Sequence, residues 1–288
     1  MRFVQFTCKS GGPQHLGVQL EQGGGIVALS KIDSSVPNNL KEFLEGGDDL
    51  LNKAKRIVSE AENVTPEAEV KFLAPVTGMD KLACIGLNYA DHAKETGEAL
   101  PERPMVFSKF PSIIIGPTDN IELPTISDEV DWEVELVIVI GKKGKHINKQ
   151  NAEDYIFGYT VAQDVSARDW QKRLNGGQFL IGKSMDTFCP LGPAVITKDA
   201  ISDVNNLRVK TWVNGKIKQD SNTRELIFKP PDIVAHLSQF VTLLPGDIIL
   251  TGTPGGVGVS RNPPEYLKKG DIVETEIEGL GRLQNKCV

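Results

Sequence analysis

Two glutamates and one aspartate supply carboxylates whose spacing could bind a metal ion. Glu133 and Glu135 lie in residues 132–140, a segment rich in β-branched residues that predicts a strand. A strand's period of two puts both glutamates on one face, with Cα atoms about 6.5 Å apart. Asp164 follows a second strand-like segment, residues 155–163. Oxygen ligands without a neighbouring His or Cys suit a hard divalent cation, so the sequence predicts a Mg²⁺ site, with Mn²⁺ or Ca²⁺ as alternatives.

The glutamate pair by itself also fits an exposed strand edge with hydrated carboxylates. On an otherwise apolar strand, however, two nearby negative charges must be offset by raised pKa values, a basic partner or a metal ion. The third acid, Asp164, favours the metal ion. A metal site that keeps water positions open would be a site of chemistry rather than a structural one.

The residues that follow Asp164 predict a helix beside the metal. Residues 166–169 have the S-x-x-D pattern of a capping box at a helix start. Arg168 and Gln171 are three apart on that helix, so both could reach the metal site. For Arg168, contact with a substrate and an ion pair with Asp164 or Glu133 are equally compatible with the sequence.

A histidine and a glutamate form a second candidate group. His92 and Glu95 are three apart, so on a helical turn the carboxylate could orient the imidazole and stabilise its charge. A lone histidine is more often a packing or surface residue, and we keep that interpretation for His15, His146 and His236.

One motif in the sequence is misleading. Residues 177–184 match G-x-x-x-x-G-K-[ST], the pattern of a nucleotide-binding P-loop. A working P-loop follows a buried strand and opens a long helix. Here residues 167–174 look helical and charged, and Pro190 and Pro193 prevent a long helix afterwards. We therefore reject nucleotide binding, and Lys183 needs another role.

The composition excludes several classes of protein. The 288 residues carry 32 Lys and Arg against 38 Asp and Glu, a formal net charge of −6, which argues against a nucleic-acid-binding protein. The longest apolar runs are far shorter than the roughly 18 residues of a membrane-spanning helix. The four cysteines show no Cys-x-x-Cys spacing, which fits a reducing compartment, and the amino terminus has no recognisable transit peptide.

The pattern of elements predicts an α+β protein with two domains. Short strands and a helical stretch over residues 39–61, interrupted by Gly46 and Gly47, indicate a small α/β domain at residues 1–70. A mostly β domain is expected at residues 71–288, where strand-like segments alternate with Gly- and Pro-containing connections.

The motifs occur in the order found in one enzyme family. Five sequence features carry the resemblance: residues 85–92 (IGLNYADH), Glu133-x-Glu135, residues 164–171 (DVSARDWQ), residues 182–184 (GKS) and residues 250–258 (LTGTPGGVG). The chain resembles the fumarylacetoacetate hydrolase family over nearly its whole length. The resemblance implies a mixed-sheet β-roll with a small α/β amino-terminal domain, and it implies a homodimer.

The resemblance also implies roles for individual residues. Glu133, Glu135 and Asp164 would hold Mg²⁺. His92 and Glu95 would form the acid/base dyad and Lys183 would be the active-site lysine, while Arg168, Gln171 and Thr253 would bind the substrate. Asp91 lies near the place where the founding member of the family has an additional aspartate ligand, and it could ligate the metal, cap a helix or face solvent.

The implied reaction acts on a small 2-oxo dicarboxylic acid through an enolate that the metal stabilises. The resemblance favours an oxaloacetate keto–enol tautomerase. The alternatives are a hydrolase that cleaves the C–C bond of acylpyruvates or related β-diketones, an oxaloacetate decarboxylase, and a metal-binding protein without catalysis. The resemblance points to the mitochondrial matrix, and the sequence alone would fit the cytoplasm. No nucleic-acid or membrane partner is expected.

Overall fold

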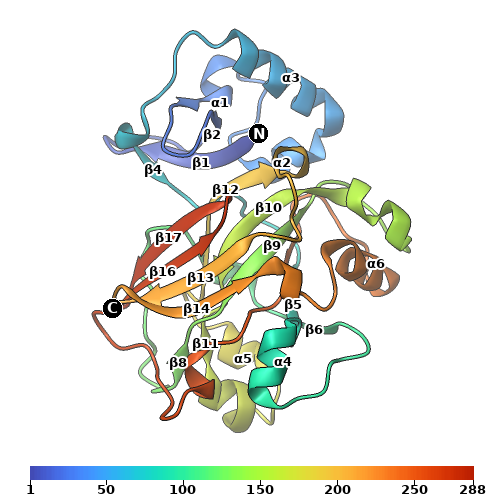
Figure 1. Cartoon of the computed structure of the whole chain (residues 1–288). Coiled ribbons are helices and arrows are strands. Elements are labelled where there is room, and N and C mark those ends of the chain that lie inside the picture. Colours follow the sequence, from blue (N-terminus) through green and yellow to red (C-terminus); the bar gives the residue numbers. More distant parts are fainter.

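An eleven-stranded mixed sheet runs through the molecule in the computed structural model, which describes residues 1–288 (Figure 1). Nine of its strands form one continuous order, and two short strands pair beside this order, one with β1 and the other with β12. Across the sheet the order is β3 (Ile26–Val27), β2 (His15–Gln19), β1 (Arg2–Cys8), β12 (Cys189–Thr197), β10 (Ile156–Gln163), β9 (Val134–Ile140), β15 (Ile248–Leu250), β5 (Leu82–Gly86) and β6 (Met105–Ser108), with β4 (Val70–Phe72) on β1 and β7 (Ile114–Ile115) on β12.

Two smaller sheets complete the β structure. The four-stranded sheet packs against β9, β10 and β12, and the two-stranded sheet lies next to the turn that follows Asp164. The four strands are, in order, β14 (Lys216–Asn222), β13 (Arg208–Val213), β16 (Ile272–Ile277) and β17 (Gly281–Lys286), and the two are β11 (Ser166–Ala167) and β8 (Val130–Asp131). With the helices, these sheets confirm the predicted α+β class.

The helices are short and lie around the sheets (Figure 1). None of them has the length and apolar content that crossing a membrane requires. The α-helices are α1 (Leu29–Ile32), α2 (Leu40–Glu45), α3 (Gly47–Glu60), α4 (Ala90–Thr96), α5 (Phe179–Lys183) and α6 (Pro230–Phe240). One π-helical turn spans Trp170–Leu174, and short 3₁₀ helices span Glu67–Glu69, Pro111–Ile113, Lys149–Tyr155, Lys198–Ala200, Thr223–Glu225 and Gly258–Ser260.

The helical stretch expected near residues 39–61 is present as α2 and α3. The side chain of Asn39 accepts a hydrogen bond from the Glu42 N–H and so begins α2. The helices meet at Gly46 and Gly47, and Gly47 has a φ of 60°, a conformation that glycine adopts at low cost. The predicted interruption is confirmed at this position.

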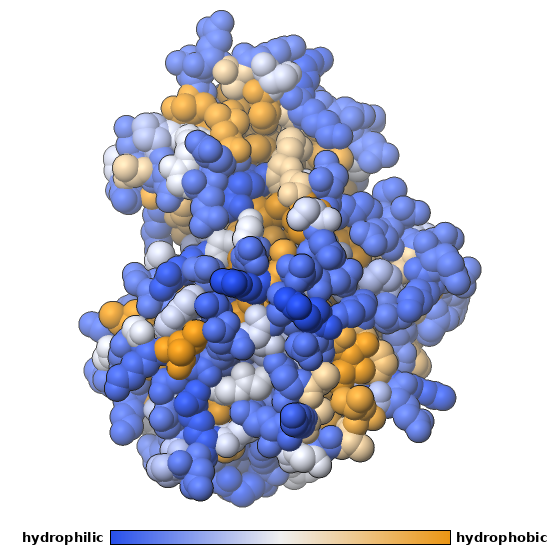
Figure 2. All heavy atoms as spheres, viewed as in Figure 1, coloured by the Kyte–Doolittle hydropathy of each residue, from blue (hydrophilic) through white to orange (hydrophobic).

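The amino-terminal elements lie at one end of the molecule and share the large sheet (Figure 1). In the β1–β12 ladder, Phe3 faces Val195, and the Phe3 ring lies 5.1 Å from the Phe43 ring and 5.3 Å from the Phe157 ring. Hydrophilic residues cover most of the visible face, and apolar side chains are exposed over these amino-terminal elements (Figure 2). The two-domain division near residue 70 stays a prediction.

Strand β9 carries the acidic pair into the centre of the sheet. All seven of its residues are buried because β10 and β15 flank it and other elements cover both faces. The strand begins at Val134, two residues later than expected, so Glu133 directly precedes it. Gln163 of β10 faces Val134, and the Asp164 N–H donates to the Glu133 carbonyl at 2.8 Å. This antiparallel register brings Asp164 beside Glu133.

The expected capping box at residues 166–169 is wrong. Ser166 is extended because β11 pairs with β8, and its hydroxyl donates to the Asp164 carbonyl. Asp169 instead stands at the N-cap position, where its carboxylate accepts from the Trp170 N–H at 2.9 Å. The helical turn therefore begins three residues later than the sequence pattern indicated.

Gly158 tests how strictly β10 must pack against β12. A Cβ at this residue would lie 2.1 Å from the Ile196 carbonyl oxygen, so we expect Gly158→Ala to lower the free energy of unfolding by about 1–3 kcal/mol. Because β10 leads to Asp164, divalent metal binding should also weaken. Denaturant unfolding and calorimetry measure both effects. In the control Gly24→Ala, the new Cβ meets the flexible Glu21 side chain at 2.7 Å and comes no closer than 3.1 Å to backbone atoms. Equal stability of the two variants would contradict the packing argument.

Candidate active site and metal centre

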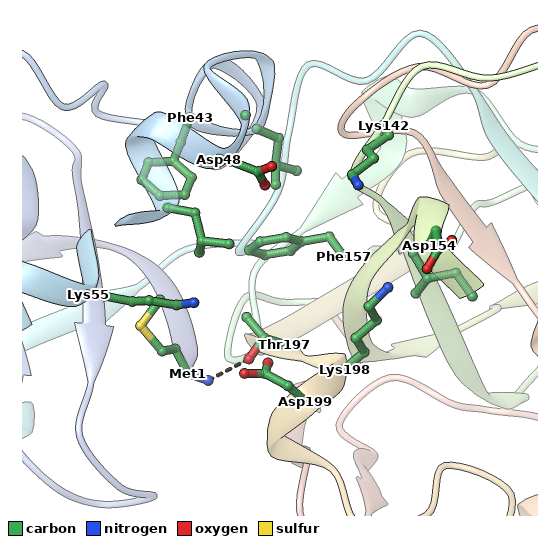
Figure 3. Close-up of a pocket in the computed structure, with 15 residues that line it drawn as sticks. Met1, Phe43, Asp48, Lys55, Lys142, Asp154, Phe157, Thr197, Lys198 and Asp199 are labelled. Atoms are coloured by element: carbon green, nitrogen blue, oxygen red, sulfur yellow. Dashed lines mark hydrogen bonds between the residues drawn. The ribbon is translucent and has the colours of Figure 1, made fainter. Parts of the chain in front are cut away.

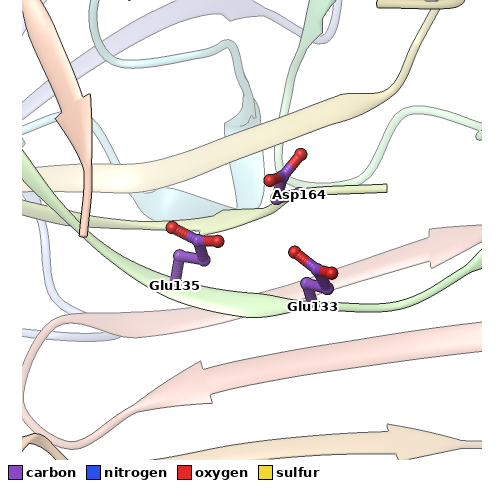
Figure 4. Close-up of side chains that lie close together, drawn as sticks. All are labelled: Glu133, Glu135 and Asp164. Atoms are coloured by element: carbon purple, nitrogen blue, oxygen red, sulfur yellow. The ribbon is translucent and has the colours of Figure 1, made fainter. Parts of the chain in front are cut away.

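The carboxylates of Glu133, Glu135 and Asp164 converge on one point (Figure 4). Each offers an oxygen, and the three oxygens lie within 4.8 Å of one another. All three residues are buried, with exposed fractions of 6%, 1% and 0%. Three buried carboxylates at this separation repel one another unless positive charge lies among them. An all-oxygen set of this kind fits a hard divalent cation.

Lys183 lies between two of these acids. Its Nζ is 2.7 Å from Glu133 Oε2 and 2.7 Å from Asp164 Oδ2, and the side chain is only 2% exposed. Lys183 is the last residue of α5, a helix of one turn that begins after Gln178. No long helix opens here, which agrees with the rejection of a P-loop.

Arg168 neutralises the other side of Glu133. Its Nη1 is 2.6 Å from Glu133 Oε1, and its Nε is 2.9 Å from Asp131 Oδ2. The predicted ion pair with Glu133 is therefore present, while the pair with Asp164 is replaced by one with Asp131. Arg168 Nη1 also donates to Gln171 Oε1 at 2.9 Å, so these two side chains do share a side of the turn. Arg168 Nη2 is buried without a partner.

Lys109 is a buried cation that the sequence analysis missed. Its Nζ forms a short ion pair with Asp164 Oδ1 and donates to the carbonyls of Val165 and Phe188, at 3.1 and 2.7 Å. Both side chains of the pair are fully buried. Lys109 follows β6 in a segment without a recognisable motif, so no sequence signal pointed to it.

Glu135 has no cationic partner. Its Oε2 accepts from the Gly252 N–H at 2.6 Å, and this is the only hydrogen bond of its carboxylate. Burial and the charges of Asp164 and Glu133 raise the pKa of Glu135 well above its usual value. Burial also tends to raise the pKa of Glu133, but Lys183 and Arg168 outweigh burial and lower that pKa to about 2. A divalent cation would supply the positive charge that Glu135 lacks.

His92 and Glu95 share one face of α4. His92 Nδ1 lies 3.1 Å from Glu95 Oε2, and Glu95 Oε1 accepts from the Gly256 N–H at 2.9 Å. The helix ends at Gly97, whose φ of 71° is the left-handed conformation of a helix C-cap. The Glu95 carboxylate thus orients the imidazole, and the glycine-rich loop, residues 252–258, holds the carboxylate in place.

Asp91 lies outside the acidic cluster. Its Oδ2 accepts a short hydrogen bond from the Ser221 hydroxyl, and its Oδ1 accepts from the Gly255 N–H at 3.4 Å. Asp91 therefore joins α4 to β14 and to the glycine-rich loop, and it is not part of the metal cluster.

A cavity of about 120 Å³ opens onto the acidic cluster. Most of the predicted site residues line it, whereas Asp164 and Glu95 are not among the lining residues. The predicted residues that line it are His92, Glu133, Glu135, Arg168, Gln171, Lys183 and Thr253. The structure thus brings together, in one enclosed space, acids, bases and cations from distant parts of the sequence.

A larger cavity of about 340 Å³ lies between the amino-terminal helices and strands β10 and β12 (Figure 3). Lys55, Lys142 and Lys198 line it, together with an equal number of aspartates. None of the predicted site residues belongs to it. It contains no cluster of metal-binding acids, so we assign the chemistry to the smaller cavity.

Comparison with known proteins identifies the family. The model described as "Fumarylacetoacetate (FAA) hydrolase C-terminal" matches residues 81–288. The human protein named oxaloacetate tautomerase FAHD2A, mitochondrial, is 53% identical over 288 residues, which are 100% of this chain and 92% of that protein. The chain belongs to the fumarylacetoacetate hydrolase family. The resemblance inferred from the sequence motifs is confirmed.

Solved structures of the fumarylacetoacetate hydrolase family share the fold. Fumarylacetoacetate hydrolase from Exiguobacterium antarcticum is 36% identical with a TM-score of 0.86, over 100% of this chain and 99% of that one. Maleylpyruvate hydrolase from Sphingobium sp. SYK-6, solved with manganese(II) and pyruvate, is 29% identical with a TM-score of 0.82, over the same shares. The second structure shows that a relative with this fold holds a divalent metal.

Metal binding should become more stabilising as the pH rises. The raised pKa of Glu135 means that the metal-free folded protein keeps a proton that the unfolded chain releases above about pH 4.5. The metal-free protein therefore loses stability with rising pH until that raised pKa is passed. Metal binding displaces the proton, so the increase in Tm on adding Mg²⁺ should be larger at pH 8 than at pH 5.5. Calorimetry in two buffers should detect proton release, and metal binding without proton release would contradict this.

Removing Lys109 should destabilise the metal-free protein more than the metal-bound protein. We expect Lys109→Met to lower the free energy of unfolding by about 3–5 kcal/mol, because Asp164 loses a buried partner. A divalent cation should restore part of this loss, which unfolding with and without Mg²⁺ measures. Lys53→Met, which removes a partly exposed ion pair with Asp33, is the control and should cost about 1 kcal/mol or less. A similarly small loss in Lys109→Met would contradict the argument.

Proposed function

We propose that this chain is a divalent-metal-dependent enzyme that interconverts the keto and enol forms of oxaloacetate. The main support is the single cavity in which His92, Lys183 and Arg168 surround the acidic cluster. A relative 53% identical over its whole alignment carries the name oxaloacetate tautomerase. The cavity of about 120 Å³ suits a small substrate rather than an extended one.

Glu133, Glu135 and Asp164 are the residues that would hold the metal ion, and we propose Mg²⁺, with Mn²⁺ or Ca²⁺ as alternatives. The fit is supported by three converging buried carboxylates, one of which has no cationic partner. A bound divalent cation supplies Lewis-acid stabilisation of negative charge on a substrate oxygen.

His92 is the group we propose to move the proton at C3 of the substrate. Its Nδ1 is engaged by Glu95, so Nε2 is the nitrogen left for proton exchange. The Glu95 carboxylate stabilises the imidazolium that forms when His92 takes the proton. His92 then delivers that proton from the same nitrogen to the C2 oxygen of the enolate, which gives the enol, and the reverse sequence gives the keto acid, so this chain needs no second base.

Arg168, Lys183, Gln171 and Thr253 would bind and orient the substrate. The unpartnered Nη2 of Arg168 is buried, and a substrate carboxylate would satisfy it. Lys183 lines the same cavity and could stabilise negative charge on a substrate oxygen. Arg168 and Lys183 are only 4% and 2% exposed, and this burial strengthens their electrostatic contacts.

Hydrolysis of an acylpyruvate is the second candidate function. The structure of maleylpyruvate hydrolase with manganese(II) and pyruvate favours it, because that protein shares the fold at a TM-score of 0.82. In that reaction the His92–Glu95 pair would activate water against a distal carbonyl. Decarboxylation of oxaloacetate is the third candidate, and metal binding without catalysis is the alternative from another class.

The cellular location of the proposed enzyme is inferred from its relatives. The human relative is named as mitochondrial, so we propose the mitochondrial matrix, with the cytoplasm as the alternative. We also propose a homodimer, a small amino-terminal domain at residues 1–70 and a catalytic domain at residues 71–288. The expected ligand is a small 2-oxo acid rather than a nucleic acid or a membrane.

Substrate turnover tests the proposed reaction directly. Metal-loaded protein receives enol-oxaloacetate and acetylpyruvate in parallel, while enol absorbance and product release are followed. We expect rapid enol decay without pyruvate or acetate. Cleavage products would replace the tautomerase with a hydrolase or a decarboxylase, and no turnover of either compound would favour the non-catalytic alternative.

Variants should separate proton transfer from metal binding. His92→Ala should lower kcat by about 10²- to 10⁴-fold and leave metal affinity unchanged, because His92 acts on the proton alone. Glu135→Gln should lose metal affinity and activity together. His236→Ala, on α6 and outside the cavity, is the matched histidine control. Full activity of His92→Ala would remove the proposed base.

A further inference from the structure

Gln219 is a buried side chain of β14 that connects the metal-ligand strand with the substrate end of the cavity. It is 1% exposed. Its Oε1 accepts from the Val134 N–H at 3.0 Å and from the Thr211 hydroxyl at 2.9 Å. Its Nε2 donates to Thr253 Oγ1 at 2.8 Å and to the Pro254 carbonyl at 3.0 Å. All four hydrogen-bonding positions of the amide are filled.

Two backbone groups fix the orientation of this amide. The Val134 N–H can only donate and the Pro254 carbonyl can only accept. A rotated amide would place NH₂ against N–H and oxygen against oxygen, and would leave buried groups unsatisfied. The group of Gln219 that meets Thr253 is therefore a donor.

The direction of this bond determines what the Thr253 hydroxyl can do. Thr253 accepts a hydrogen bond from Gln219, so its own proton must point elsewhere. No protein acceptor for that proton is present, and Thr253 lines the cavity beside Glu133 and Glu135. The free proton is thus available to a ligand.

We propose that Gln219 is a positioning residue that makes Thr253 a hydrogen-bond donor to a substrate oxygen. This inference rests on the proposed function, since it takes Thr253 to contact the substrate. It adds a specificity rule: the substrate must present an acceptor here, such as a distal carboxylate. A ligand with an ammonium group at that end would leave the Thr253 proton opposite another donor.

Gln219 also sets where this donor stands relative to the metal ligands. Val134 lies between Glu133 and Glu135, and the Gln219 amide reaches from that backbone N–H to Thr253. One side chain therefore fixes the distance between the acidic cluster and the hydroxyl. The fit of a substrate that touches both ends depends on this distance.

A double-mutant cycle tests whether Gln219 acts through Thr253. The variants are Thr253→Val, Gln219→Met and the two combined, each loaded with Mg²⁺. The measurements are KM and kcat for oxaloacetate, and calorimetric binding of malate, a dicarboxylate of the same length that cannot enolise. We expect Thr253→Val to raise KM and the malate Kd about tenfold, the size of one hydrogen bond to a charged group. Gln219→Met should raise KM and the malate Kd by a smaller factor. In each variant kcat should change little.

The test depends on whether the effects of Thr253→Val and Gln219→Met on malate binding are coupled. If Gln219 acts through Thr253, the double variant should bind malate no more weakly than Thr253→Val alone. Losses that simply add would overturn the proposal, and so would unchanged malate binding in Thr253→Val. Thr253→Ser, which keeps the hydroxyl, should stay within about threefold of the unmodified protein.

Controls separate positioning from general loss of stability. Gln5 of β1 is also a fully buried glutamine, with bonds to the Leu40 N–H and the Ala74 carbonyl, far from the cavity. Gln5→Met should lower Tm while leaving the malate Kd unchanged. If Gln219→Met does not fold, Gln219→Glu replaces it, because its carboxylate accepts where the amide donates and would turn the Thr253 proton away from the cavity.

The outcomes distinguish this proposal from the proposed function. Coupled losses in malate binding without tautomerase activity would overturn the reaction and keep the positioning role. Tautomerase activity together with additive losses in malate binding would support the proposed reaction and overturn the positioning role of Gln219. A protein that neither binds malate nor converts oxaloacetate would overturn both.

Discussion

The need to balance several negative charges in a buried space governs the active site. The three carboxylates of the metal site and that of Asp131 in β8 lie buried, and three buried cations face them. The cations also align the carboxylates, because the two oxygens of Glu133 meet two different basic groups, and so do the two oxygens of Asp164. Glu135 is left without a cation, and burial makes that charge costly. A divalent ion resolves this imbalance, so metal binding and a stable charge distribution depend on the same geometry.

The register of the large sheet produces that geometry from distant parts of the chain. The β9–β10 ladder brings Asp164 beside Glu133, and the β9–β15 ladder brings the loop after Leu250 beside Glu135. Gly252 has a φ of 102°, and a Cβ there would lie 2.8 Å from Asn88 Cβ. Glycine therefore allows this loop to approach both the acidic strand and the segment that leads to His92.

Residues with a strong local signal could be predicted from the sequence, and residues defined by tertiary contacts could not. The apolar run of residues 132–140 with its two acids indicated a strand, and the spacing of His92 and Glu95 indicated a shared helix face. The capping pattern at Ser166 was misleading because pairing with Asp131 in β8 outweighed the local preference. Lys109 and Gln219 had no local signal, because the partners that define their roles are distant in the sequence: Asp164 is 55 residues from Lys109, and Thr253 is 34 residues from Gln219.

Polar side chains, rather than the sheet ladder alone, hold the metal ligands at their positions. Where β9 begins, the Glu133 N–H donates to the Gln163 side chain and the Val134 N–H donates to the Gln219 side chain. Gln163 in turn donates to Thr275, and Gln219 donates to Thr253, so the two amides extend in different directions from the same stretch of backbone. A buried N–H without a partner is costly, which makes both glutamines part of the fold. Because the Gln219 amide also determines the direction of the Thr253 hydroxyl, the hydrogen bond that stabilises the start of β9 simultaneously sets the polarity of the cavity wall.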